Sequence, residues 1–508
     1  IGGSLTFIPS MNHTFEGSYI FSSNQPGNTI TSARQRLNLN ATFEGGGEWI
    51  LQDSFNVYFE LNVQSGIFRT NDQPINANFF YSRNADPREI YLGDSRITIE
   101  SRQDSFFYCE MNLRSQNLVF DAGSSIIDLQ GSYGGSVVAN GEDNLVFNVI
   151  NFYVPYGSFY QSIVDPALNP TVMVDSMAFY NTGFISGYNE MNYLYLAPGR
   201  HYELRTGEEL IVNELIANGS CEDGTTSIVS SFPDETASLS LPIGQIFERL
   251  YLRDIELTAG APAVANVSID GLGNTGWQIT EETGRTLFWV GGEGEWFDPT
   301  HWSPNSGVAG GECIPTLIDN VIVDGNSSTA IDFSIFNNSD RYTNCYDISW
   351  TPGLTDINYF NVRRMRIAGS FTNEGNLNFG ASPVYYLGTA DHTITMGNAR
   401  FFDFIFEQTC TYAFLDDFLG YGITHQRGTV NFTDQTGDLE LLTIVSSPNP
   451  KFMNLGDAHL RLSYNYDGFT GAFSAYGAAN VTIDPGNSLV ELTSTSGTIR
   501  ADYGVAFN

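Results

Sequence analysis

Asn117-Leu-Val-Phe-Asp-Ala-Gly123 recurs as Asn480-Val-Thr-Ile-Asp-Pro-Gly486, an offset of 480 − 117 = 363 residues. Two more pairs of stretches have the same offset: Glu48-Trp-Ile-Leu-Gln-Asp-Ser-Phe55 with Thr411-Tyr-Ala-Phe-Leu-Asp-Asp-Phe418, and Leu92-Gly-Asp94 with Leu455-Gly-Asp457. A period of this length is a domain-scale tandem repeat and exceeds one solenoid coil. We therefore expect one unit of about 366 residues, followed by the first part of the next, excerpted from a longer array.

Short β-branched pieces dominate the chain between these matches. Thr29-Ile-Thr31 and Ile126-Ile-Asp-Leu129 are examples, and each is bounded by Gly, Asn, Asp or Ser. This is typical of short strands joined by turns. Residues 207–217 fit a weak helix and a strand equally well. The sequence predicts an all-β fold of short-stranded β-solenoid and β-sandwich-like modules in tandem repeat.

The repeat divides the chain into four expected segments. Residues 1–140 are the β-solenoid part of the first unit, and residues 141–284 are a second β module. Residues 285–366 form a tryptophan-rich junction, and residues 367–508 start the second unit. The junction holds the stretch Leu287-Phe-Trp-Val-Gly-Gly-Glu-Gly-Glu-Trp-Phe-Asp-Pro-Thr-His-Trp302.

Three tryptophans of this stretch allow two interpretations. Trp289, Trp296 and Trp302 lie among Gly and Pro residues, which favour tight turns. Tryptophan buries a large area when it packs, so the stretch predicts a compact cap at the joint between two units. The alternative is a ligand-stacking platform for sugars.

Charge and hydropathy exclude several classes of partner. The formal net charge is −35, and Lys451 is the only lysine. Such a surface repels nucleic acid and anionic lipid. No apolar run is long enough to span a bilayer. The chain opens on Ile1 without a signal peptide, so we expect a mature product or a piece of a longer protein.

Several motifs after the tryptophan stretch resemble, in order, modules of very large secreted surface proteins of Bacteroidota. They are Gly310-Gly-Glu-Cys-Ile-Pro-Thr316, Asp319-Asn-Val-Ile-Val-Asp-Gly-Asn326 and Cys345-Tyr-Asp-Ile-Ser-Trp350. The resemblance implies type IX secretion, long tandem arrays, a cell-surface location, and roles as adhesins or filaments. Implied partners are neighbouring repeat units, a homo-oligomeric filament, and surface glycans or a prey or host surface.

Five cysteines show no zinc-ligand spacing. In an exported protein, a bridge between Cys313 and Cys345 would staple the least strand-like part of the unit and stabilise it by roughly 3–4 kcal/mol. We therefore expect a Cys313–Cys345 disulfide. Cys109, Cys221 and Cys410 have no predicted partner.

The chain shows no recognisable catalytic motif. Asp416-Asp417 resembles the paired aspartates of polygalacturonases, but the Asn-Thr-Asp, Gly-His-Gly and Arg-Ile-Lys motifs of those enzymes do not occur. Asp416 also matches Asp53 in the repeat, which indicates a turn residue. No histidine has a serine or cysteine partner in a nucleophile motif. We expect no enzymatic activity and no catalytic or cofactor-binding residues. A β-helical polysaccharide-degrading enzyme is the weaker alternative.

The Asx-Gly pairs of the chain are compatible with bound calcium. Asp324-Gly-Asn326 and Asp270-Gly271 resemble turns that ligate Ca²⁺, although turn geometry alone explains them. The sequence thus predicts a non-enzymatic structural or adhesive repeat of a large extracellular protein. A carbohydrate-binding surface module is the alternative.

Overall fold

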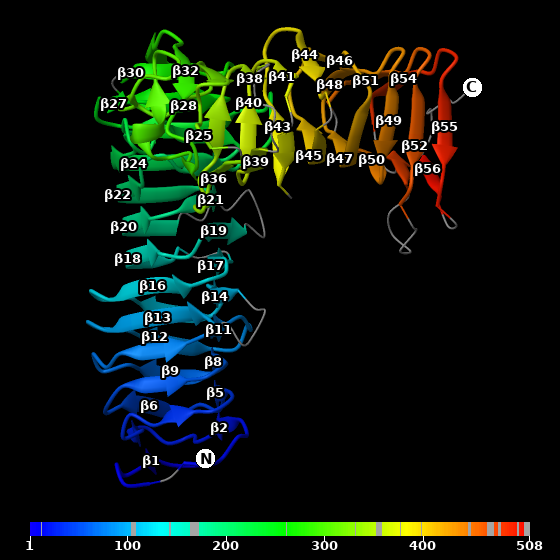
Figure 1. Cartoon of the computed structure of the whole chain (residues 1–508). Coiled ribbons are helices and arrows are strands. Elements are labelled where there is room, and N and C mark those ends of the chain that lie inside the picture. The colour runs from blue at the N-terminus through cyan, green and yellow to red at the C-terminus, as the bar shows by residue number, and fades with distance from the viewer. Residues whose placement is uncertain are drawn as a thin grey trace. The chain divides into compact units, whose positions relative to one another are not determined.

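A computed structural model describes residues 1–11, 13–102, 108–141, 144–162, 172–260, 262–330, 332–351, 358–375, 377–380, 382–397, 399–445, 449–464, 472–475, 479–494 and 497–501. The chain splits into two compact units, and Figure 1 labels many of their strands. Unit 1 is Ile1–Gly219 with Thr225–Glu281, and unit 2 is Ser220–Gly224 with Glu282–Asn508. Each unit has its own hydrophobic core. No helix within the described ranges is long and apolar enough to cross a membrane.

Unit 1 is a β-solenoid of stacked parallel strands, which confirms the predicted all-β fold class. Its described strands form three sheets. The first is β1 (Leu5–Thr6), β3 (Asn28–Thr31), β6 (Glu48–Leu51), β9 (Gly66–Arg69), β12 (Arg88–Tyr91) and β15 (Leu118–Asp121). The second is β4 (Arg36–Leu37), β7 (Phe55–Val57), β10 (Ile75–Ala77), β13 (Arg96–Ser101), β16 (Ile126–Gly131), β18 (Val146–Phe152), β20 (Val172–Phe179), β22 (Asn189–Leu196), β24 (Glu209–Ile216), β26 (Ala237–Leu241) and β29 (Ile255–Gly260).

The third sheet is β2 (Tyr19–Phe21), β5 (Ala41–Phe43), β8 (Glu60–Val63), β11 (Phe79–Ser82), β14 (Cys109–Arg114), β17 (Gly135–Asn140), β19 (Tyr156–Ser162), β21 (Thr182–Ser186), β23 (His201–Leu204), β25 (Thr226–Ser230), β28 (Leu250–Arg253), β30 (Ala263–Asp270) and β27 (Ile246–Glu248), with β31 (Trp277–Glu281) paired to β30. Side chains alternate between core and solvent because successive residues of a strand point to opposite faces. Residues 209–216, where helix and strand both fitted, form strand β24.

The shape of the coil changes within unit 1. Up to β17 each full coil places one strand in each of three sheets, and from β18 onward it places strands in only two. This change falls at the expected segment boundary, residue 140. The core nevertheless runs from Phe7 to Ala265 as one cluster. Segment 1–140 and most of segment 141–284 therefore share unit 1, because parallel pairing continues through the change in coil shape; Ser220–Gly224 and the residues from Glu282 onward belong to unit 2.

Unit 2 is a second solenoid with two large sheets. One is β34 (Trp302–Ser303), β32 (Thr286–Trp289), β35 (Asn320–Val323), β38 (Ile348–Trp350), β41 (Phe371–Asn373), β44 (His392–Thr395), β46 (Thr411–Phe414), β48 (Gly428–Asn431), β51 (Lys451–Asn454) and β54 (Val481–Asp484). The other is β33 (Gly294–Glu295), β36 (Ser334–Phe336), β37 (Thr343–Cys345), β39 (Asn358–Asn361), β40 (Met365–Ile367), β42 (Leu377–Phe379), β43 (Pro383–Tyr386), β45 (Arg400–Phe406), β47 (Phe418–His425), β49 (Thr436–Leu439), β50 (Leu441–Ile444), β52 (His459–Leu462), β53 (Phe473–Ala475), β55 (Leu489–Leu492) and β56 (Ile499–Ala501). The one described helical turn is η2 (Pro299–His301). Segments 285–366 and 367–508 share this unit.

The sequence repeat is a repeat of turn geometry. Asn117 and Asn480 both adopt a left-handed conformation, with φ of 55° and 53°. Gly123 and Gly486 do the same, with φ of 56° and 48°. A Cβ on Gly123 would lie 2.5 Å from the carbonyl oxygen of Gly93 in the preceding coil, and a Cβ on Gly486 would lie 2.3 Å from the carbonyl oxygen of Gly456. Only glycine fits both the conformation and the space, which explains why these stretches recur.

The same aromatic cluster forms in both copies. In unit 1 the rings of Phe21 and Phe43 stack with centroids 4.6 Å apart, and Trp49 meets Phe21 edge-on at 5.0 Å. In unit 2 Tyr386 stacks on Phe406 at 5.1 Å, and Tyr412 lies 4.7 Å from Tyr386. Each cluster lies in the core of its own unit. The repeat thus preserves ring positions while the residue types vary.

Candidate functional site

The tryptophan stretch begins unit 2 and supplies the edge strands of both sheets. Strand β32 pairs antiparallel with β34 at one edge, and β33 forms the edge of the other sheet. An edge strand exposes unpaired backbone groups that can recruit other chains. A short antiparallel strand at the end of a parallel stack covers that edge, so the stretch is a cap of the unit 2 core.

The three tryptophans are core residues. Trp289, Trp296 and Trp302 are each 0% exposed. Trp302 meets the other two rings edge-on, with centroids 5.0 Å from Trp289 and 4.7 Å from Trp296. Its Nε1 donates to the carbonyl oxygen of Trp296 at 2.8 Å. A stacking platform needs an exposed ring face, so this burial corrects the ligand-stacking alternative.

The glycines of the stretch make room for His301. Its ring stacks on Trp289 with centroids 4.6 Å apart, and its Nδ1–H donates to the carbonyl oxygen of Val290 at 2.7 Å. A side chain at Gly294 would overlap the His301 ring. Gly291 adopts a φ of 86° and Gly292 a φ of 78°, which other residues rarely reach. The glycines of the Gly-Gly-Glu-Gly pattern therefore allow the tight turn and the close packing of the His301 ring.

The disulfide joins Cys221 to Cys313, which lie 92 residues apart in the sequence with Cα atoms 4.6 Å apart. This corrects the expected Cys313–Cys345 bridge. Cys345 is free and points from β37 into the core, where burial raises the pKa of its thiol. Cys313 instead lies beside the loop Ser220–Gly224. The backbone N–H of the next residue, Ile314, donates to the carbonyl oxygen of Cys221 at 3.3 Å.

An ion pair holds the same loop. Arg341 Nη1 lies 3.0 Å from Asp223 Oδ1, and its guanidinium carbon lies 3.7 Å from the ring centre of Phe297. Ser220 Oγ donates to Asp223 Oδ2 at 2.8 Å. The bridge and these contacts together fix Ser220–Gly224 within unit 2, although both flanking segments belong to unit 1.

A buried cation occupies equivalent positions in the two units. Arg88 Nη1 donates to the carbonyl oxygens of Asp86 and Gln116, each at 2.9 Å. The single lysine, Lys451, donates from Nζ to the carbonyl oxygens of Asn449 at 2.7 Å and Ala479 at 3.1 Å. All three positions differ by the 363-residue offset of the repeat. Burial lowers the pKa of both side chains. The cations therefore satisfy backbone carbonyls between coils.

Replacing Lys451 with methionine should lower the free energy of unfolding by about 2–3 kcal/mol. Methionine fills the volume of the aliphatic stem but leaves the two carbonyls without a donor, and each unpaired buried group costs about 1–3 kcal/mol. Relief of the buried charge offsets part of this. Urea unfolding followed by far-UV circular dichroism measures the change. Lys451→Arg is the matched control, and equal losses for both variants would contradict this role.

The repeated aspartates cap turns. Asp53 Oδ1 accepts from the backbone N–H of Ser32 at 2.8 Å. Asp416 accepts from the N–H groups of Met396 at 2.7 Å and Gly397 at 2.6 Å, and Asp417 accepts from the N–H of Thr436 at 2.7 Å. The pair that resembled hydrolase aspartates thus bonds to the backbone in the described structure, as expected for turn residues.

One histidine has the serine partner that sequence motifs did not reveal. His201 Nδ1 lies 3.0 Å from Ser227 Oγ, and its Nε2 lies 3.3 Å from Glu203 Oε1. Strand pairing brings His201 opposite Ser227. Serine, histidine and carboxylate in this order occur in hydrolase triads. His201 and Ser227 are only 6% and 5% exposed, however, and three surface cavities on unit 2 are lined by other residues.

Two isolated titratable groups lie in unit 2. Burial raises the pKa of Asp403 to about 6, and burial lowers the pKa of His425 to about 4. His425 Nε2–H donates to the carbonyl oxygen of Gly428 at 3.0 Å. Asp403 makes long contacts to Thr424 Oγ1, at 3.5 and 3.4 Å. Apart from the Thr424 hydroxyl beside Asp403, no second acid, base or nucleophile among the described residues is hydrogen-bonded to either group.

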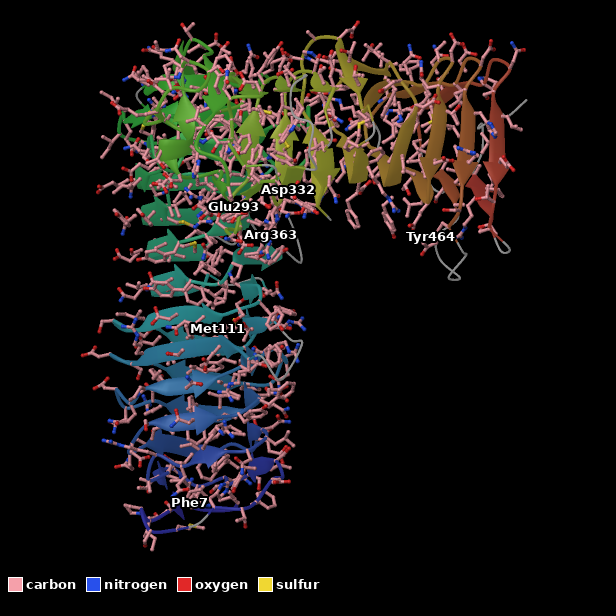
Figure 2. All side chains as sticks on the ribbon, in the orientation of Figure 1. Phe7, Met111, Glu293, Asp332, Arg363 and Tyr464 are labelled. Carbon is pink, nitrogen blue, oxygen red and sulfur yellow. A yellow bond between two sulfur atoms is a disulfide. The ribbon has the colours of Figure 1, made fainter. Side chains whose placement is uncertain are left out.

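Two neighbouring cavities open on unit 2, each of about 490 Å³. One lies beside the cap and is lined by turn residues that include Thr300, Asn326 and Asp332. The other lies on the 15-stranded sheet and includes Arg363. Glu293 lines both, and Figure 2 labels Glu293, Asp332 and Arg363 on the ribbon of unit 2. Ser334 and Phe336 also line the second cavity. Sequence reasoning missed all of these residues, although the alternation Ser334-Ile-Phe336 places Ser334 and Phe336 on the outer face of β36.

No group of three or more metal-ligating side chains occurs in the ranges described above. No ligand set is therefore assigned to the calcium that the Asx-Gly pairs left open. No protein family model, curated protein or solved structure matches the chain.

Proposed function

We propose that the chain is a non-enzymatic structural and adhesive repeat of a large extracellular surface protein. The observation that carries the proposal is the 363-residue repeat, in which the same turn glycines, aspartate caps and buried cations recur. Residues retained in both copies therefore have structural roles. Such stacks suit a mechanical function, because each coil adds backbone hydrogen bonds along the axis.

Two further features support an extracellular location. The Cys221–Cys313 disulfide is typical of proteins in oxidising compartments. The net charge of −35 favours a soluble surface that neither binds nucleic acid nor adheres to anionic lipid. Both features agree with the surface adhesins and filaments that the sequence motifs resemble.

Immunogold electron microscopy on cells that produce the protein tests this function. Antibody raised against the chain should label the outside of intact cells, and cells lacking the gene should attach less to surfaces. A variant with Ser227→Ala should restore attachment fully, because the proposal assigns no chemistry to that serine. Labelling confined to the cell interior would overturn the proposal, as would loss of function in Ser227→Ala with normal folding.

A further inference from the structure

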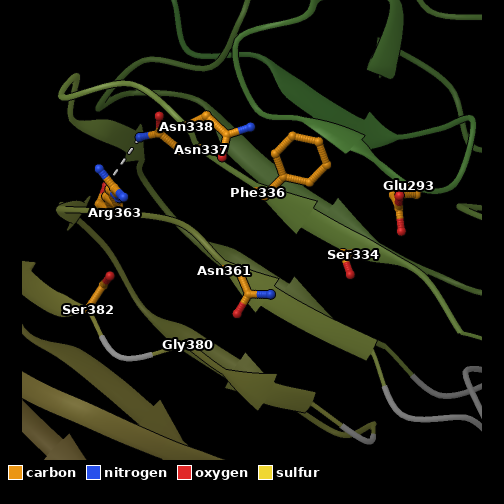
Figure 3. Close-up of a pocket in the computed structure, with 9 residues that line it drawn as sticks. All are labelled: Glu293, Ser334, Phe336, Asn337, Asn338, Asn361, Arg363, Gly380 and Ser382. Atoms are coloured by element: carbon orange, nitrogen blue, oxygen red, sulfur yellow. Dashed lines mark hydrogen bonds between the residues drawn. The ribbon is translucent and has the colours of Figure 1, made fainter.

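A polar groove crosses the outer face of the 15-stranded sheet in unit 2. Figure 3 shows its lining, and its volume is about 490 Å³. The side chains that matter here are those of Glu293, Ser334, Phe336, Asn361, Arg363 and Ser382. Ser334 and Phe336 belong to β36, and Asn361 ends β39; Glu293 precedes β33, Arg363 follows β39 and Ser382 precedes β43.

Strand pairing sets the spacing of these side chains. Phe336 of β36 lies directly opposite Asn361 of β39. Gly380 follows the next strand, and a Cβ there would lie 2.7 Å from Asn361 Oδ1, so the missing side chain keeps the groove open. Three neighbouring strands span roughly 10 Å, since the spacing between strands is about 4.8 Å. The row therefore matches an elongated ligand about as long as a disaccharide.

The polar groups of the groove are available to a ligand. Within the described part of the chain, the side chains of Ser334, Asn361 and Ser382 form no hydrogen bond. Serine hydroxyls and asparagine amides both donate and accept, as sugar hydroxyls do. Arg363 is 63% exposed, and its ion pair with Asp340 is long, at 3.9 Å. The guanidinium can therefore turn to a ligand hydroxyl, and Glu293 offers an acceptor.

The partly buried Phe336 ring adds an apolar surface among these groups. A peptide would add to the sheet through free backbone groups, but the backbone of β36 and β39 is already paired on both sides. The strongly negative chain disfavours nucleic acid. A ring with one apolar face and many hydroxyls fits this mixture best.

We propose that this groove binds a neutral oligosaccharide, with one sugar ring against Phe336 and hydroxyls bonded to Asn361, Ser334 and Arg363. This inference rests on the proposed adhesive function and gives it a ligand class. It also moves the carbohydrate-binding alternative from the buried tryptophans to a surface that a glycan can reach.

A glycan array carrying neutral and acidic oligosaccharides tests the groove, using the whole chain. The best neutral glycan is then titrated by isothermal calorimetry against three variants. Phe336→Ala and Asn361→Ala should each weaken binding by at least ~10-fold. Asn454→Ala is the matched control, because Asn454 lies on β51 in the other sheet of unit 2. It should leave the affinity unchanged, and circular dichroism should show all variants folded.

Three outcomes would overturn the groove assignment. They are the absence of any bound glycan, a preference for acidic glycans that persists in Arg363→Gln, and folded Phe336→Ala and Asn361→Ala variants that bind the glycan as tightly as the unaltered chain. The outcomes separate the two proposals. Glycan binding by a protein found only inside cells would overturn the surface function, whereas surface labelling without glycan binding would overturn the groove alone.

Discussion

Reduction of the Cys221–Cys313 bridge should lower the free energy of unfolding by about 4 kcal/mol. The two cysteines are 92 residues apart, and a covalent link of that span removes much of the conformational freedom of the unfolded chain. The bridge also holds Ser220–Gly224, which after reduction is still anchored by the Arg341–Asp223 ion pair and nearby hydrogen bonds. Urea unfolding of unit 2, followed by tryptophan fluorescence with and without dithiothreitol, measures the loss.

Cysteine variants identify which pair carries the effect. Cys345→Ala should remain as sensitive to dithiothreitol as the natural chain, because Cys345 is a free thiol on the inward side of β37. A double variant with Cys221→Ser and Cys313→Ser should be insensitive to the reductant. Peptide mapping without reductant should recover residues 221 and 313 in one linked fragment. A fragment linking residues 313 and 345 would contradict the assignment.

The disulfide shows what the sequence could not reveal. The repeated glycines and asparagines could be identified from the sequence because a left-handed turn restricts the residue type, as at Gly123 and Gly486. The partner of Cys313 depends on which loops meet in space, and no local rule restricts that. The spacing to Cys345 suggested a loop of convenient size, but strand alternation directs Cys345 into the core.

Equivalent positions in the two copies of the repeat also escaped detection wherever the residue type differed. Arg88 and Lys451 share a position and a role, yet the two side chains differ, so stretch-by-stretch matching did not expose them. The residues of the groove were even harder to identify from the sequence. Ser334 and Asn361 face solvent, where folding places little restriction on residue type, so their alignment appears only once strand register is known. Fold class was thus predictable, and the outward-facing site was not.

Trp302→Ala should destabilise unit 2 by about 3–5 kcal/mol, the usual cost of removing a large buried aromatic side chain. The ring lies between Trp289 and Trp296, so its loss leaves a cavity beneath the edge strand. It also removes the Nε1 donor to the carbonyl oxygen of Trp296. Because β34 has a sheet partner on one side only, the cap should open before the coils that follow.

Hydrogen exchange measured by mass spectrometry locates this effect. Amides of residues 286–303 should exchange at least ~10-fold faster in Trp302→Ala, since each loss of 1.4 kcal/mol raises the open population tenfold. Trp49→Ala is the matched control, because Trp49 is buried to the same degree in the core of unit 1. It should speed exchange around β6 and leave residues 286–303 unchanged. Equal protection of the cap in both variants would show that the tryptophans do not hold it. Faster exchange of residues 286–303 in Trp302→Ala but not in Trp49→Ala would indicate that this stretch, which by sequence alone suited a binding patch, closes the unit 2 core.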